Sequence, residues 1–302
     1  MQQEKTHKSG YVAVIGRPNV GKSTLTNAIL KFPLSIITAK PQTTRHRILG
    51  IHSEENAQII FLDTPGLIDP HYKLQEWMMK AAKSALNDAD IILFLVEATS
   101  KPKSKDIEIL QTFAESEHRL ILVINKVDAI EKAEILPLID AYRQLYNFID
   151  IVPISALTGE NIDDLKKSIV DNLPAGPLFF PQDVITERPE RFFVSELIRE
   201  QIFENFRDEL PFSTAVVVEE FREREGHKDY IKARIIVERE SQKKIVIGKG
   251  GQAIRDIGQR SRTKIEDFLG RPVYLELFVA VREKWRKKDV FLKEFGYDFR
   301  SI

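Results

Sequence analysis

One short segment, Gly16 to Ser23, constrains this chain more than any other part of its sequence, GRPNVGKS. It follows a short apolar run at residues 11–15 and opens an amphipathic stretch, which is the strand–loop–helix context of a phosphate-binding P-loop. The glycines allow backbone N–H groups to turn inward around phosphate oxygens, and the helix N-terminus adds a partial positive charge. A glycine-bearing turn with a chance lysine is the alternative, and the position directly after a strand disfavours it.

The residue types in this loop assign two side chains to nucleotide chemistry. We expect Lys22 to reach the β- and γ-phosphates and the Ser23 hydroxyl to take a Mg²⁺ coordination position. The residues expected to hold the nucleotide here are Gly16, Arg17, Pro18, Asn19, Val20, Gly21, Lys22, Ser23 and Thr24.

A second segment indicates which base the nucleotide carries: Asn125-Lys126-Val127-Asp128. It ends a β-branched apolar run and therefore lies at the carboxyl edge of a sheet, where such folds bind ligands. Guanine presents two donors on one edge, and the Asp128 carboxylate can accept from both, whereas adenine would leave it unpaired. We expect Asn125 to support the loop and the base, and the Lys126 stem to cover the ring. Alone, this tetrapeptide is more typical of a surface turn, but its place downstream of a P-loop favours a guanine site.

Two further segments complete the predicted site, Asp63-Thr64-Pro65-Gly66 and Ser155-Ala156-Leu157. The first follows an apolar run, so Asp63 emerges at a strand end, where it can hold the magnesium shell, and Gly66 can offer its N–H to a γ-phosphate. The second is expected to place backbone amides near the guanine carbonyl, although as a motif it carries almost no information.

These four segments, in this order, resemble the translation-factor-like class of small GTPases. By that resemblance, Thr44 matches the switch threonine that closes on Mg²⁺ and the γ-phosphate, with Thr43 as the rival candidate and a polar solvent loop as the alternative for both. The expected catalytic residues are Lys22, Thr44, Asp63 and Gly66. The expected metal ligands are Ser23, Thr44 and Asp63.

Two positions modify the mechanism that this resemblance implies. Leu67 stands where Ras-like enzymes carry a glutamine that orients the attacking water, and leucine cannot do so. We therefore expect slow intrinsic GTP hydrolysis, completed by a backbone group, a water chain or a partner. Asn19 resembles the asparagine that helps to hold a potassium ion in a subset of related GTPases, so K⁺ is expected to activate hydrolysis.

The first half of the chain alternates short apolar runs with amphipathic stretches, which predicts an α/β fold with a mostly parallel, doubly wound sheet and helices on both faces. The expected strands are residues 11–15, 48–52, 58–62, 90–96, 120–124 and 151–154. The periodicity stops where four prolines occur close together, Pro174, Pro177, Pro181 and Pro189. We expect a polar extension at 1–9, a GTPase domain at 10–173, a linker at 174–190 and a second domain at 191–302.

The second domain contains a Gly-x-x-Gly loop, from Gly248 to Gly251, before a predicted helix at 252–269. The apolar residues just before the loop are expected to form a strand or turn. Earlier come a helical stretch at 192–206 and β runs at 214–221 and 230–238, and a strand at 273–281 follows. This order is similar to the α+β type II KH arrangement, in which the loop admits a nucleic-acid backbone and an apolar groove holds unpaired bases. The expected RNA-binding residues are Lys244, Ile247, Gly248, Lys249, Gly250, Gly251, Ile254 and Arg255.

Charge is balanced over the whole chain, with 45 basic and 45 acidic residues, but it is uneven locally. Residues 239–264 carry eight basic side chains against two acidic, and a basic C-terminal run at 282–293 carries six against two. Each cluster alone is equally well explained as a solvated face, but together with the glycine loop they favour RNA.

Composition narrows the setting. The chain has no cysteine, so it contains no disulfide, thiol nucleophile or thiolate metal site, which fits a reducing cytosol. Its first ten residues lack an apolar signal core, and its apolar runs are far shorter than the roughly 18 residues of a membrane-spanning helix. A cytoplasmic protein is expected.

The joined architecture resembles the Era family of bacterial GTPases, which carry a C-terminal KH domain. The likeness covers nearly the whole chain and includes Pro41-Gln42-Thr43-Thr44-Arg45, Leu173-Pro174 and the segment 270–277, GRPVYLEL. The resemblance implies binding near the 3′ end of small-subunit ribosomal RNA, a role in small-subunit maturation, a monomer, and a peripheral fraction at the cytoplasmic face of the inner membrane.

Two other functions compete with this reading. A metabolic P-loop kinase is disfavoured by the Asn125–Asp128 segment. A membrane-signalling GTPase would use its basic C-terminal domain to bind anionic lipid rather than RNA, and the Gly-x-x-Gly loop argues against it.

Overall fold

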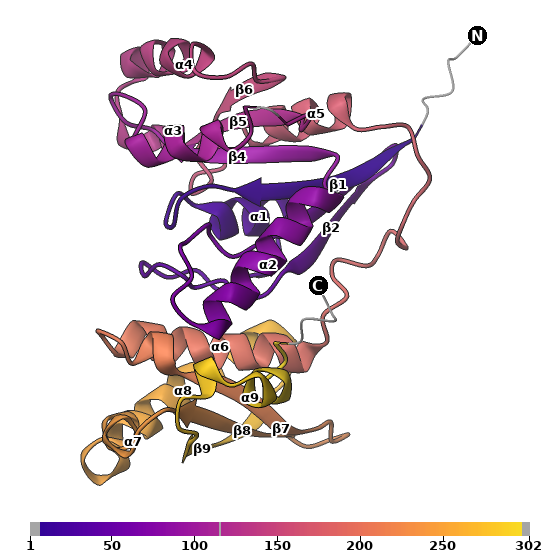
Figure 1. Cartoon of the computed structure of the whole chain (residues 1–302). Helices are drawn as coiled ribbons and strands as arrows, with labels where there is room; N and C mark the ends of the chain where they lie inside the picture. The colour runs from indigo at the N-terminus through magenta and orange to yellow at the C-terminus, as the bar shows by residue number, and fades with distance from the viewer. Residues whose placement is uncertain (1–6, 115, 298–302) are drawn as a thin grey trace.

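Two β-sheets, each covered by helices, make up the protein in the computed structural model, which describes residues 7–114 and 116–297 (Figure 1). The larger sheet belongs to the N-terminal half and the smaller to the C-terminal half. In Figure 1 the smaller sheet lies below the larger, and an extended segment descends beside the larger sheet to connect the two units.

The larger sheet has six strands in the order β2-β3-β1-β4-β5-β6. Its strands are β1 (Lys8–Ile15), β2 (Ile48–Glu54), β3 (Ala57–Asp63), β4 (Ile91–Glu97), β5 (Leu120–Asn125) and β6 (Asp150–Pro153). Every neighbouring pair is parallel except β2 and β3, which confirms the predicted mostly parallel sheet. Because β1 begins at Lys8, residues 8 and 9 belong to the sheet and not to the predicted polar extension, whose residues 1–6 lie outside the described ones.

Helices cover both faces of this sheet, as the apolar strands require. The helices are α1 (Lys22–Leu30), α2 (Lys73–Asp88), α3 (Ser104–Gln111), α4 (Ile135–Arg143) and α5 (Ile162–Asn172), with short 3₁₀ turns η1 (Val127–Ala129) and η2 (Lys132–Glu134). Alternate residues of β1 face opposite sides: Val12 packs in one core with α1 and α5, and Ala13 in the other with α2, α3 and α4.

The smaller sheet has three strands in the order β7-β8-β9. Its elements are α6 (Glu190–Asn205), η3 (Pro211–Ser213), β7 (Ala215–Arg222), β8 (Asp229–Val237), α7 (Glu240–Ile247), η4 (Lys249–Gly251), α8 (Gln252–Leu269), β9 (Val273–Val281), η5 (Trp285–Lys287) and α9 (Asp289–Glu294). β7 runs antiparallel to β8, and β8 runs parallel to β9. Helices α6, α7 and α8 contribute buried residues to the core of this unit, which confirms the expected α+β arrangement.

One predicted element is wrong. The apolar residues before the glycine loop, expected as a strand or turn, form the last turn of helix α7. β-branched residues favour strands, but tertiary context overrides that preference here. The helix begins upstream, where the Gln242 side chain accepts from the backbone N–H groups of Glu238 and Arg239, and only Val246 of the apolar triplet is fully buried.

The linker is fixed along the edge of the larger sheet. The Ile185 carbonyl accepts from the N–H of Ile51 at 2.7 Å, and the side chain of Thr186 donates to the Leu49 carbonyl at 2.7 Å. The Gln58 side chain accepts from backbone N–H groups of the linker at 2.9 and 3.0 Å. Because β2 is an edge strand, the contacts at Ile51 and Leu49 satisfy part of its open hydrogen-bonding edge.

The basic C-terminal run is folded and not a free tail up to Tyr297; residues 298–302 lie outside the described part. Trp285 is fully buried, and it belongs with Tyr297 to an apolar cluster that includes Trp77 and Met78 of α2. The two halves of the chain therefore share a small core. None of the helices in residues 7–114 and 116–297 is long and apolar enough to cross a membrane.

Candidate nucleotide site and nucleic-acid interface

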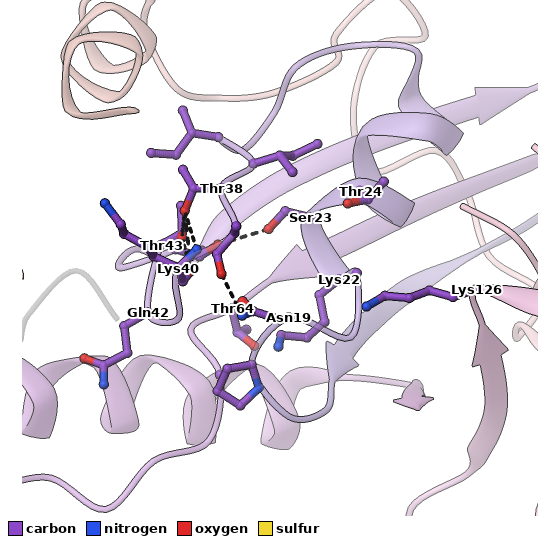
Figure 2. Close-up of a pocket in the computed structure, with 17 residues that line it drawn as sticks. Asn19, Lys22, Ser23, Thr24, Thr38, Lys40, Gln42, Thr43, Thr64 and Lys126 are labelled. Carbon is purple, nitrogen blue, oxygen red and sulfur yellow. Dashed lines mark hydrogen bonds between the residues drawn. The ribbon is translucent and has the colours of Figure 1, made fainter. Parts of the chain in front are cut away.

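The glycine-rich loop between β1 and α1 borders an open pocket of about 450 Å³, shown in Figure 2. Gly16 and Gly21 have φ angles of 149° and 101°. A Cβ atom at Gly16 would lie 2.2 Å from the Leu95 carbonyl oxygen, and one at Gly21 would lie 2.2 Å from Nδ2 of Asn125. Glycine is therefore required at both positions, by conformation and by space.

Most predicted loop residues face this pocket, and some do not. The predicted residues that line it are Pro18, Asn19, Gly21, Lys22, Ser23, Thr24, Thr44, Thr64, Gly66 and Lys126. Val20 instead packs in the core, and the Thr64 hydroxyl donates to the Val14 carbonyl at 3.3 Å. Pro65 is also buried. Val20 and Pro65 therefore support the loops from behind, whereas Thr64 lines the pocket and is held to β1 by its hydroxyl.

Lys22 is positioned by the loop that it serves. Its Nζ donates to the carbonyl oxygens of Gly16 and Arg17, at 3.0 Å each. Burial lowers the pKa of this lysine to about 8, although Asp63 partly opposes the shift. A Cβ atom on Gly66 would lie 3.5 Å from the Lys22 Nζ, so the predicted γ-phosphate donor stands next to the lysine.

The three predicted metal ligands converge. Ser23 Oγ lies 3.1 Å from Thr44 Oγ1 and donates to Asp63 Oδ2 at 3.5 Å. Asp63 is fully buried, and its Oδ1 has no hydrogen-bond partner among the described residues. Burial raises the pKa of this carboxyl, although a hydrogen bond from Ser35 opposes the rise. An all-oxygen set with an unpaired buried carboxylate oxygen fits Mg²⁺, which prefers such ligands.

Ser35 is a site residue that sequence analysis missed. Its hydroxyl donates to Asp63 Oδ2, and its backbone is held by the Asn27 side chain through two hydrogen bonds of 2.8 and 3.1 Å. No spacing motif marks either residue, because the contact joins a loop after α1 to the end of β3.

The loop at residues 36–44 separates the two candidate switch threonines. The Thr43 hydroxyl lies 2.7 Å from that of Thr38 and donates to the Lys40 carbonyl at 2.8 Å, away from Ser23 (Figure 2). Thr44 alone of the pair reaches Ser23. Asn19, which has a φ of 66°, donates to the Ala39 carbonyl at 2.9 Å and so joins the P-loop to this segment.

The segment from Asn125 to Asp128 contributes one side chain that holds loops together and one carboxylate that is free to bind a base. Asn125 donates to the Val20 carbonyl at 2.8 Å and accepts from the N–H of Ala156 at 2.9 Å, so it ties three loops together. Asp128 is exposed on η1 together with the buried Val127, and its carboxylate accepts no hydrogen bond from any described residue. Its oxygens are free to accept from a base.

Two predicted contacts on this side differ in exposure. Ser155 is fully buried, whereas Leu157 is 80 % exposed. Lys126 has a φ of 68°, and its Nζ binds Glu97 Oε1 at 2.7 Å. Glu97 was not identified from the sequence.

The glycine loop of the smaller domain lies beside a groove of about 420 Å³ between α8 and β9. Gly248, Gly250 and Gly251 all have positive φ angles, of 73°, 59° and 78°. The groove is lined by Ile254, Arg255, Gly258, Gln259, Arg262, Leu275 and Leu277. Apolar walls with basic rims suit an unpaired base and its phosphate.

The predicted RNA-binding residues divide between surface and core. Lys244 and Lys249 are exposed, and Arg255 donates to the Gly250 carbonyl, which stabilises the loop. Ile247, which is expected to line the base groove, is half-buried and packs against the core of this unit, as Ile254 does.

The segment that carries Thr44 is bound to the smaller domain. Arg199 of α6 donates to the Thr43 carbonyl at 2.6 Å. The Lys40 side chain donates to the carbonyl of Phe203, in the last turn of α6, and to that of Phe206, the C-cap of the helix. Arg45 is 3 % exposed and donates over 2.8 to 3.1 Å to the carbonyls of Pro211, Phe212 and Thr214. Sequence analysis did not identify these contacts.

The fold and the site together define a class of protein: a P-loop GTPase joined to a KH domain. Two family models match, one described as a 50S ribosome-binding GTPase over residues 11–126 and one as a KH domain over residues 209–286. Curated relatives named GTPase Era include those of Geotalea uraniireducens, 49% identical over 98% of this chain and 99% of the relative, and of Lacticaseibacillus paracasei, 47% identical over 98% and 99%. The chain belongs to the GTPase Era family, and it is a GTPase.

Solved structures agree with this assignment. A variant of Aquifex aeolicus Era bound to GDP and AlF₄⁻ is 44% identical, covers 97% of this chain and 100% of its own, and superposes with a TM-score of 0.92. Era in complex with MgGDPNP and nucleotides 1506–1542 of 16S ribosomal RNA is 45% identical, with the same coverage and a TM-score of 0.92.

Proposed function

We propose that this GTPase binds GTP and GDP with Mg²⁺ through the residues described above, and that it binds single-stranded RNA near the 3′ end of small-subunit ribosomal RNA to assist assembly of that subunit. The domain division proposed for this task is 8–173, 174–190 and 191–302, with the first boundary moved to the start of β1. The related Era whose title names MgGDPNP and nucleotides 1506–1542 of 16S ribosomal RNA supports both ligands.

The observation that carries the proposal is the physical link between the two sites. Thr44, one of the predicted metal ligands, lies beside Ser23, while its neighbours Thr43 and Arg45 bind the KH half. A change at the γ-phosphate that moves this segment must therefore disturb the domain that carries the RNA groove. That is the arrangement expected of a nucleotide-controlled RNA-binding switch.

The test is RNA crosslinking and sequencing with the full chain loaded with GDP or with a non-hydrolysable GTP analogue. We expect crosslinks concentrated near the 3′ end of small-subunit rRNA, with a yield that differs between the two nucleotides. Crosslinks spread evenly over ribosomal RNA would contradict the RNA assignment, and equal yields would contradict nucleotide control.

Potassium activation is a finer part of the same proposal. Asn19 is positioned at the pocket by its bond to the Ala39 carbonyl, which places polar oxygen and amide groups at the rim. We expect GTP hydrolysis to be faster in K⁺ than in Na⁺ at equal ionic strength, and Asn19→Asp to change that ratio. Equal wild-type rates in the two salts would remove the idea.

Peripheral binding to an anionic membrane is a second candidate, which one surface favours. Lys287 and Lys288 are exposed beside Val290, which is 75 % exposed, on the folded C-terminal segment. Cationic side chains around an apolar one suit an anionic lipid surface. Co-sedimentation with phosphatidylglycerol vesicles should fall for Lys287→Glu if this surface binds lipid.

A further inference from the structure

The first turn of α3 touches both halves of the nucleotide site from outside the pocket. Lys103 is the N-cap of this helix, and Asp106 lies in its first turn, where its N–H donates to the Lys103 carbonyl at 2.9 Å. Neither residue lines the nucleotide pocket. Each forms an ion pair with a residue that in turn contacts a lysine of the pocket. Asp106 connects in this way to Lys22 at the phosphate end, and Lys103 connects to Lys126 at the base end.

The phosphate half is reached through Arg17. Arg17 Nε donates to Asp106 Oδ1 at 2.6 Å, and Tyr142 of α4 donates its hydroxyl to Asp106 Oδ2 at 3.2 Å. Asp106 is fully buried, so both bonds to its carboxylate are made in a low-dielectric setting. The Arg17 carbonyl accepts from Lys22 Nζ at 3.0 Å. One P-loop residue thus connects the buried carboxylate to the phosphate-binding lysine.

The base half is reached through Glu97, the last residue of β4. Each of its two carboxylate oxygens binds one lysine: Lys103 Nζ lies 2.9 Å from Oε2, and Lys126 Nζ lies 2.7 Å from Oε1. Hydrogen bonds from Lys126 and then Lys103 lower the pKa of Glu97 to about 2, despite partial burial, so the carboxylate stays ionised. Lys126 lines the pocket where its stem is expected to cover the guanine ring.

We propose that the turn formed by Lys103 to Asp106 is a shared positioning element for the nucleotide, which fixes the P-loop through Arg17 and the base-covering Lys126 through Glu97. It complements the direct brace from Asn125 to the Val20 carbonyl. The proposal rests on the nucleotide site proposed above and is independent of RNA binding. These are positioning residues, so they set how tightly the nucleotide is held and not the chemical step.

The test compares Asp106→Asn and Glu97→Gln in the full chain, by competition of GMP, GDP and a GTP analogue against a fluorescent GDP. We expect Asp106→Asn to weaken GDP binding about tenfold, since it breaks a buried pair, and GMP much less, because the P-loop contacts the β-phosphate. Glu97→Gln should weaken GMP and GDP alike, by about threefold, because its pairs are partly exposed.

The matched control is Asp171→Asn, which removes an exposed pair with Lys167 of 3.0 Å outside the site and should change no nucleotide affinity. RNA affinity and thermal melting report whether each variant folds. Should Asp106→Asn fail to fold, Tyr142→Phe replaces it, because it removes one donor and retains the ion pair with Arg17. Nucleotide affinities within twofold of wild type in the folded variants, or an equal loss for GMP and GDP in the Asp106 or Tyr142 variant, would overturn the proposal.

The double variant Lys103→Gln with Asp106→Asn, compared with each single variant, tests whether one turn positions both the phosphate half and the base half of the nucleotide site. If it does, the combined loss of GDP affinity departs from the product of the single losses by about threefold or more, as expected for residues that share a support. Strict additivity would show two independent contacts and contradict a shared element.

Discussion

Asn125 and Asp128 come from one tetrapeptide, yet the structure gives them different tasks. Asn125 uses both ends of its amide to join loops and is 2 % exposed, so it has little left for the base. Asp128 stands exposed, with no partner among the described residues. We therefore expect base recognition to depend on Asp128 and loop geometry to depend on Asn125.

Asp128→Asn should exchange guanine preference for xanthine preference. The carboxylate accepts from two guanine donors, whereas an amide offers one acceptor and one donor, which matches the N1–H and C2 carbonyl of xanthine. We expect GDP affinity to fall about 10³-fold, since a site built for a donor pair rejects an analogue that lacks its match. XDP should then bind more tightly than GDP, measured by competition against a fluorescent nucleotide.

Glu131→Gln is the control for this exchange, because it alters charge at an exposed position that follows the same loop. It should leave the preference for GDP over XDP intact. Equal weakening of GDP and XDP in Asp128→Asn would show that Asp128 supports the loop and does not read the base.

Leu67 bears on the rate and not on binding. It is half-buried and carries no polar atom, so it cannot orient the attacking water. We expect wild-type turnover without partners on the order of 10⁻³ to 10⁻² s⁻¹, the range of switch GTPases that lack an activating protein. Leu67→Ala should stay within about threefold of it in a phosphate-release assay, since the change removes no water-orienting group. Wild-type turnover near 10 s⁻¹, typical of metabolic enzymes, would contradict this view.

Sequence alone was sufficient for residues whose role follows from local spacing. Lys22, Ser23 and Asp63 were predicted as neighbours, and the structure brings them together. Ser35, Glu97 and Asp106 were not predicted, because each acts through a partner far along the chain. A contact between a helix turn and a distant loop leaves no periodic or spacing signal in one sequence.

At the scale of elements, the glycine loop between α7 and α8 depends on backbone conformation more than on side chains. Gly248 ends α7 with a φ of 73°, and a Cβ atom there would lie 2.7 Å from the Ala253 Cβ. Gly251, by contrast, has open space apart from the Arg255 guanidinium, 3.5 Å from an added Cβ. Substitution at Gly251 therefore tests the surface of the loop with less disturbance of its packing than substitution at Gly248.

Gly251→Asp should weaken binding of single-stranded RNA. The new carboxylate would pair with Arg255 and repel the phosphates that pass the loop, so we expect a loss of about tenfold or more at physiological salt, which shrinks at high salt. Electrophoretic mobility shift with a 3′-terminal fragment of small-subunit rRNA measures it.

Gly226→Asp supplies a matched control for the same substitution. Gly226 has a φ of 72°, close to that of Gly251, and lies in the turn between β7 and β8 with nothing within 4 Å of an added Cβ. Both variants bear the same conformational strain, so only a difference between them reports on RNA. Equal RNA affinities in the two variants would exclude the loop from the RNA interface.

Elements were predicted well where one pattern extended over a whole segment. The six strands of the larger sheet follow from apolar runs, and the runs of the inner strands β3, β4 and β5 are buried on both faces. Helix α7 was missed because its apolar triplet resembles a strand. The attachment of the linker to β2 was not predicted, because it depends on which strand lies at the edge of the sheet, and one sequence does not show the strand order.

At the scale of the whole molecule, the interface between the halves is built around the switch segment. Three cations, Lys40, Arg45 and Arg199, make the polar contacts of this segment with the KH half. Elsewhere in the interface, Lys73 of α2 pairs with Asp289 of α9, and Trp77 of α2 joins the apolar cluster of the C-terminal segment. Two segments expected near the γ-phosphate, the loop that carries Thr44 and the start of α2, therefore both contact the KH half. Nucleotide state and RNA affinity must be linked reciprocally if this interface changes with either ligand.

Arg199→Lys should reduce that linkage. Arg199 is 1 % exposed, pairs with Glu196, and reaches the Thr43 carbonyl at 2.6 Å. Lysine keeps the charge but has a single terminal nitrogen, so it cannot hold both partners in the same geometry. We expect the ratio of RNA affinities between the GDP and GTP-analogue states to move toward one, by about fivefold if the contact carries about 1 kcal/mol of coupling.

Arg191→Lys is the comparison that isolates the contact across the interface. Arg191 lies on the same helix and donates to the Val218 carbonyl at 2.6 Å within the KH half. It makes a similar bond to a backbone oxygen without touching the switch segment, so its variant should retain the wild-type ratio. If Arg199→Lys also retains that ratio while the protein stays folded, the coupling runs through the apolar cluster around Trp77 instead, and the polar contacts at Thr43 serve stability alone.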